Sequence, residues 1–165
     1  MFKLKPLSKD AVESALAKAE RYRLLNEADE AESICLDVLE VDPGNQAAQV
    51  MLLLALSDQC GEASGAGPRA QQLAAGLKNE YERWYYSGLV AERRARAYLK
   101  RGGAATVGIY DWLMEALDCF ERAESVRPPG NDDAILRWNT CVRVLQRHPE
   151  LRPSNDLREE PLFLE

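Results

Sequence analysis

Three basic residues form the most distinctive chemical pattern in the sequence. Arg93, Arg96 and Lys100 are spaced three and four residues apart, so they would share one face of a helix. A planar guanidinium can bind a carboxylate through two hydrogen bonds, so this basic stripe predicts a site for an acidic peptide. The alternative is a solvated helix face, because cations near a helix C-terminus also interact favourably with the helix dipole.

Residues that could catalyse a reaction or bind a metal are sparse. His148 is the single histidine, and its place before a proline suits a helix end better than catalysis. The glycine-rich segment 61–67 contains no lysine, unlike a phosphate-binding loop. We therefore expect no enzyme activity and no cofactor. We also expect no metal site. The four cysteines have neither C-x-x-C spacing nor a cluster of histidines beside them; they are Cys35, Cys60, Cys119 and Cys141.

Composition limits the classes of partner. The formal net charge is −6, which argues against a general nucleic-acid-binding protein. No apolar run approaches the length of a membrane span, and the first residues lack the apolar segment of a signal peptide. A cytoplasmic location is therefore expected, with the four cysteines as reduced thiols.

Helical patterning dominates the chain, and strand-type alternation is nearly absent. We predict a lead-in at 1–7, a helical domain at 8–148 and an extended tail at 149–165. Ser8 is the expected N-cap of the first helix. Seven helices are predicted. The first covers 8–26, and the second runs from the turn at 26–29 to residue 41. The other five cover 46–59, 68–79, 80–101, 109–126 and 132–147.

One apolar helix face occurs twice with the same spacing. Its first copy consists of Ala31, Cys35 and Val38, followed by a proline five residues later. Its second copy consists of Ala116, Phe120 and Ala123, again with a proline five residues later. A face repeated at fixed spacing indicates a repeat protein.

These positions resemble the tetratricopeptide-repeat family, whose repeat is a helix-turn-helix of about 34 residues. Ala19 and Tyr22 precede the first copy, and Ala95 and Tyr98 precede the second, with about nine extra residues before Ala116. The resemblance implies an all-α, antiparallel helix-turn-helix solenoid. Its repeats would cover 10–45, 46–79 and 80–130, and a capping helix would cover 131–148. The middle repeat is weak, with Leu53 and Leu56 at the small and aromatic places.

The resemblance also implies a function, namely a protein-interaction scaffold that binds a peptide in its concave groove. The expected groove residues come from the first helix of each repeat, together with an asparagine that could bond a peptide backbone: Glu20, Arg23, Leu54, Leu89, Glu92, Arg93, Arg96, Lys100 and Asn139. The lysine-and-asparagine clamp that some members use for a terminal carboxylate is not expected, because glutamate and aliphatic residues stand at the matching places of the first two repeats.

Other interpretations remain open from the sequence. The protein could instead be a homo-oligomer, or a small-molecule sensor or enzyme on a helical scaffold. The aromatic residues at 81–86 suit either core packing or a binding hot spot. The tail could be disordered, or it could dock in cis or in a neighbouring subunit. In the docked case its apolar residues 162–164 would enter a groove, while Glu159 and Glu160 would meet the basic stripe.

Overall fold

The structure, a computed structural model, describes residues 2–61, 65–102 and 108–154. Within these ranges the chain forms helices and no strand, which confirms the all-α prediction there. None of the described helices combines the length and the apolar character that crossing a bilayer requires. After a short 3₁₀ turn at Lys9–Ala11, the helices are α1 (Val12–Leu24), α2 (Ala28–Val41), α3 (Gln46–Asp58), α4 (Ala66–Ala75), α5 (Glu80–Arg101), α6 (Ile109–Ser125) and α7 (Asp133–Arg147).

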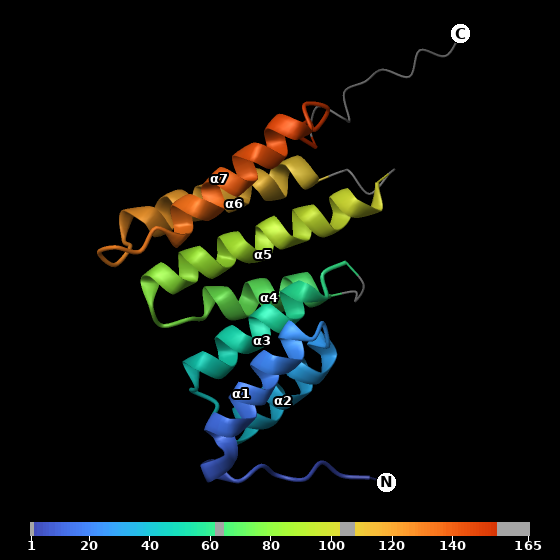
Figure 1. Cartoon of the computed structure of the whole chain (residues 1–165), viewed down its shortest axis with the longest axis vertical. Coiled ribbons are helices and arrows are strands. Elements are labelled where there is room, and N and C mark those ends of the chain that lie inside the picture. The colour runs from blue at the N-terminus through green and yellow to red at the C-terminus, as the bar shows by residue number, and fades with distance from the viewer. Residues whose placement is uncertain (1, 62–64, 103–107, 155–165) are drawn as a thin grey trace.

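Each helix packs against the next one in the chain, from α1 and α2 at one end of the molecule to α6 and α7 at the other (Figure 1). A second set of contacts joins α1 to α3, α3 to α5 and α5 to α7. The odd-numbered helices therefore form a continuous row. α5 is the longest helix, and it contacts α3, α4, α6 and α7.

The repeated apolar face forms the core of both ends of the molecule. Its six residues, three in α2 and three in α6, are fully buried. A comparable buried face occurs in the segment predicted as the middle repeat, where Ala70 and Ala74 of α4, and Leu77 just after its end, are at most 1% exposed. Small residues at these positions let neighbouring helices approach closely, so the spacing in the sequence identifies the faces that pack.

α3 is buried on several sides, as its nearly continuous apolar sequence predicts. It contacts α1, α2, α4 and α5, and Leu52, Leu53 and Leu56 are buried within it. At the far end, α7 packs on α6 and α5 but leaves Leu136 63% exposed. The residues that follow α7 are not a free tail throughout, because Leu151 is buried in the cluster formed with α5, α6 and α7.

The extra residues between Tyr98 and Ala116 lengthen two helices, because α5 continues to Arg101 and α6 starts at Ile109. The added turns are packed, since the Trp112 ring on α6 lies edge-on to the Tyr98 ring, with centroids 4.9 Å apart. The Arg94 guanidinium stacks 4.5 Å from the centroid of the same Trp112 ring. Of the predicted loop, residues 103–107 lie outside the described residues.

Two helix boundaries differ from the sequence prediction. Ser8 precedes only the 3₁₀ turn and makes no side-chain capping bond, and α1 begins later, at Val12. α4 spans Ala66–Ala75 rather than 68–79, with Gly76 as its C-cap residue, and Asn79 caps α5 by accepting a hydrogen bond from the Glu82 amide. Asn45 caps α3 in the same way, through the Ala48 amide. An asparagine side chain can accept a hydrogen bond from a free amide in the first turn of a helix, so it stabilises the helix start at that position.

Candidate binding surface

Charged side chains from all four odd-numbered helices meet along one row. The row begins at Asp58 on α3, whose two carboxylate oxygens accept from different helices. Oδ2 accepts from Nε of Arg23 on α1 at 2.7 Å, and Oδ1 accepts from Nη1 of Arg93 on α5 at 2.6 Å. Nη1 of Arg93 also donates to the buried Ser57 hydroxyl at 2.6 Å. Asp58 therefore ties α1 and α5 together and holds both guanidinium groups in place.

The row continues at Glu92, a carboxylate of α5 with no exposed surface. Its Oε1 accepts from Nη1 of Arg96 at 3.2 Å, and both of its oxygens lie 3.5 Å from Nη1 of Arg137 on α7. A buried carboxylate requires cations or donors, because removing it from water is costly. Burial alone would lower the pKa of Arg137, but Glu92 and a hydrogen bond with Tyr85 outweigh burial and raise that pKa.

A hollow of about 250 Å³ lies between α3 and α5, beside these ion pairs. Its lining consists of Ser57, Asp58, Arg93, Arg96, Ala97 and Lys100. The side chain of Arg96 is 49% exposed even though it pairs with Glu92. Lys100 is exposed, and among the described residues no carboxylate pairs with it. Both cations can therefore reach a ligand in the hollow without a rearrangement of the core.

The row carries a surplus of positive charge. Two carboxylates, Asp58 and Glu92, face five cations: Arg23, Arg93, Arg96, Lys100 and Arg137. The surplus of three contrasts with the net charge of −6 for the whole chain. Burial lowers the pKa of Arg93 and the neighbouring Asp58 acts in the opposite direction, but an arginine remains protonated in either case. The hollow therefore attracts anions.

The structure brings most of the predicted groove residues to this row, but not all as open surface. The basic stripe lines the hollow, and the carbonyl of half-buried Leu54 accepts from Arg93 at 3.4 Å. Leu89 is 3% exposed and Glu92 is fully buried, so neither offers surface to a ligand. Glu20 is exposed on α1, and Asn139 is half-buried on α7.

Sequence reasoning missed Asp58, Ser57 and Arg137, which complete the row. Asp58 stands four residues after Leu54 and therefore shares its helix face, a spacing that could have identified it. Arg137 carries no such signal, because its partner Glu92 lies 45 residues away in the sequence.

The aromatic residues at the start of α5 pack between helices. The rings of Tyr81 and Tyr85 stack with centroids 5.6 Å apart, and Tyr85 lies 6.1 Å from the buried Phe120 ring of α6. Trp84 is half-buried, with the Arg122 guanidinium 4.7 Å from its ring centroid. Stacking within α5 and packing against α6 thus account for these ring contacts.

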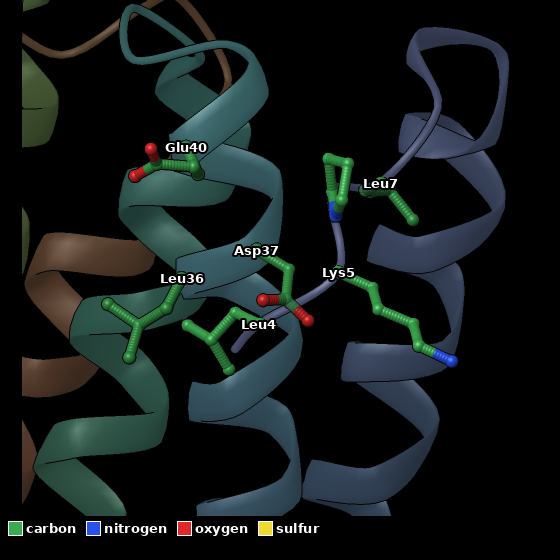
Figure 2. A pocket seen from close by; sticks show the side chains of 7 residues that line it. Leu4, Lys5, Leu7, Leu36, Asp37 and Glu40 are labelled. Atoms are coloured by element: carbon green, nitrogen blue, oxygen red, sulfur yellow. The ribbon is translucent and has the colours of Figure 1, made fainter. Parts of the chain in front are cut away.

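A second hollow, of about 410 Å³, lies at the other end of the molecule. Figure 2 shows it between the N-terminal segment and α2, with Leu4 beside Leu36 and the Lys5 side chain extending away. Asp37 and Glu40 also line it. Phe2 and Leu4 are almost fully exposed and Leu36 is 46% exposed, so this end of the molecule presents apolar surface.

The four thiols are buried, free and unreactive in character. Burial raises the pKa of Cys35 and Cys141 to about 12 and that of Cys119 to about 11, and it also raises the pKa of Cys60. Among the described residues, no group of three or more histidine, cysteine, aspartate or glutamate side chains is placed to hold a metal ion.

His148 lies at the end of α7, where its Nδ1 is 2.9 Å from Oε1 of Glu150. The backbone hydrogen bond at Glu150 and the contact with His148 lower the pKa of that carboxyl. The arrangement is exposed and local to the helix end.

No family model matches the chain, and no curated protein matches it.

Proposed function

We propose that the chain is a tetratricopeptide-like solenoid scaffold that binds an acidic segment of a partner protein on its odd-numbered helices, without catalysis. Two kinds of observation support the proposal. The repeated faces of α2 and α6 are buried alike, as stacked helix pairs require. The row of odd-numbered helices carries the charged hollow, so the surplus of positive charge lies on one connected surface.

The observation that carries the proposal is that one cation of the hollow is held by neighbouring side chains while two others are exposed. Asp58 and Ser57 fix the Arg93 guanidinium, so its orientation is set before a ligand arrives. Arg96 and Lys100 keep exposed donors that can pair with ligand carboxylates. A preorganised cation loses less conformational entropy on binding, and mobile neighbours can adapt to the spacing of the acids.

The expected affinity is weak and sensitive to salt. Exposed ion pairs contribute about 0.2–1 kcal/mol each, so two or three pairs in a shallow hollow give weak binding alone. Salt screens charges over about 8 Å at physiological ionic strength, so binding should weaken as salt increases.

A fluorescein-labelled peptide of alternating glutamate and alanine tests the proposal by fluorescence anisotropy. K100E changes an exposed cation without removing a described ion pair, and we expect it to weaken peptide binding about tenfold. The matched control is K5E, which makes the same charge change on the exposed N-terminal segment and should leave binding unaltered. Equal affinity of wild type and K100E would exclude the hollow as the peptide site.

Self-association is a second candidate function, favoured by the exposed apolar residues around the N-terminal hollow. Phe2, Leu4 and Leu36 together present surface that a second copy could cover. Light-scattering mass at several concentrations tests this, with an F2S/L4S variant as the comparison. A mass equal to one chain for wild type at every concentration would exclude it.

A further inference from the structure

The sequence at 155–165 has a charge balance opposite to that of the hollow. Among its eleven residues are four acids, Asp156, Glu159, Glu160 and Glu165, and a single base, Arg158. The segment thus has a surplus of three negative charges, and the row on the odd-numbered helices has a surplus of three positive charges. Such a match favours attraction between the two, and salt would weaken it.

The chain enters this segment from a position fixed at the start of α6. Leu151 is buried in the cluster of α5, α6 and α7, and the Ser154 amide donates to Oδ2 of Asp111 at 3.3 Å. Asp111 lies in the first turn of α6, which follows the last turn of α5 in the chain. The end of α5 that carries Lys100 is therefore the end nearest to Ser154.

The segment is long enough to reach the hollow. A fully extended chain spans up to about 3.3 Å per residue, so the eleven residues cover about 36 Å and Glu160, six residues after Ser154, reaches about 20 Å. Packed helix axes lie about 8–10 Å apart, so the last turns of α5, which carry Arg96 and Lys100, lie within about 20 Å of the α6 start that holds Ser154. The N-terminal hollow is a poorer candidate, because it lies at the opposite end of the molecule (Figure 1).

We propose that residues 155–165 occupy the charged hollow of their own chain, with Glu159 and Glu160 pairing with Arg96 and Lys100. Tethering supplies an effective concentration in the millimolar range, so weak ion pairs suffice to hold the segment. The segment then acts as a built-in competitor. An acidic partner must displace it, which lowers the apparent affinity for that partner. The inference uses the same hollow as the proposed function.

Paramagnetic broadening in NMR spectra of the full chain tests the contact directly. A spin label attached at E165C should react selectively, because the native thiols are buried with raised pKa values. We expect broadened amide signals at residues 57–58 and 96–100, and unbroadened signals at Leu36 and Glu40. No broadening around the hollow would overturn the proposal.

Mixing isotopes separates cis from trans docking. A sample combining isotope-labelled chains without a spin label and spin-labelled chains without isotopes should show no broadening at the hollow. Broadening in that sample, at residues 96–100 or at Leu36 and Glu40, would mean that the segment docks on a second copy, which overturns docking in cis.

Charge reversal links the contact to binding. E159K/E160K should abolish the broadening and tighten binding of the glutamate–alanine peptide about fivefold. The control D118K/E121K makes the same charge change on the exposed surface of α6 and should change neither. Unchanged peptide affinity in E159K/E160K, with no broadening in the wild type, would overturn the proposal that residues 155–165 compete for the hollow. The proposed function would remain intact. Broadening without any peptide binding to E159K/E160K would support the contact and refute the proposed function.

Discussion

Gly88 on α5 lies directly against the ring of Phe120 on α6. A Cβ built on Gly88 would be 2.8 Å from Cε1 of that ring and 3.1 Å from the Cβ of Cys119. Phe120 is fully buried and belongs to the repeated face, so its ring cannot move into solvent. The α5–α6 pair therefore depends on a residue without a side chain at this position.

Replacing Gly88 by alanine should destabilise the protein. Overpacking a core costs about 1–3 kcal/mol, and the better helix propensity of alanine recovers part of that. We expect a net loss of about 1–2 kcal/mol in the free energy of unfolding, measured by urea denaturation. G76A is the matched control, because its Cβ would meet only backbone oxygens at 3.6 Å. Adding F120L to G88A should restore part of the loss, and a G88A protein as stable as the wild type would contradict the close packing.

Removing the charge of Glu92 should also destabilise the protein, by about 2 kcal/mol, because hydrogen bonds to charged groups contribute about 1.5–3 kcal/mol. E92Q keeps the shape of the side chain but loses the attraction to Arg96 and Arg137. Hydrogen exchange of the backbone amides in α7 should become faster, because Glu92 connects α5 to α7 through Arg137. The control D118N breaks an exposed pair with Arg122 and should cost at most about 0.5 kcal/mol. Equal losses in the two variants would count against a special role for the buried carboxylate.

Asn45, which caps α3 in the structure, and Ser8, which the sequence predicts as a cap, should respond differently to alanine substitution. Oδ1 of Asn45 accepts from the Ala48 amide at 2.9 Å, so N45A should cost about 1 kcal/mol of stability. Ser8 makes no side-chain capping bond, so S8A should leave the melting temperature unchanged. Thermal unfolding followed by circular dichroism compares the two. A larger effect for S8A than for N45A would reverse the assignment of the caps.

Alkaline pH should destabilise the fold through its buried thiols. The pKa values of Cys35 and Cys141, about 12, and of Cys119, about 11, are raised from 9.0, so the folded chain keeps protons that the unfolded chain releases. Their contribution to stability is complete below pH 9 and is lost as pH rises through the folded pKa values. Each thiol can contribute a slope of up to about 1.4 kcal/mol per pH unit.

Urea midpoints measured on both sides of pH 9 check this dependence. C119S removes one ionisable thiol and should flatten the decline above pH 9. An identical decline in the wild type and C119S would show that other groups, such as tyrosines and lysines, cause the loss.

The sequence alone determined the helices and their buried faces. The spacing of Ala31, Cys35 and Val38, and of their counterparts in α6, predicted residues that are fully buried. The physical reason is local, because 3.6 residues per turn place such residues on one side of a single helix. Helix boundaries required more than side-chain type and spacing, since Ser8 has the right side chain for a cap but makes no capping bond, and α4 ends at Ala75, before the boundary at 79 that the spacing predicted.

Tertiary structure decided which charges are free and which are held. Arg93 and Arg96 look equivalent in the sequence. In the structure, Asp58, 35 residues before Arg93, holds the Arg93 guanidinium, whereas Arg96 pairs with the buried Glu92. Glu92 and Arg96 would appear in the sequence as an ordinary surface pair at i and i+4. The packing of α7 against α5 brings Arg137 to Glu92 and leaves that carboxylate without exposed surface. Burial of a charge depends on how helices distant in sequence are placed around it, and helical spacing carries no information about that placement.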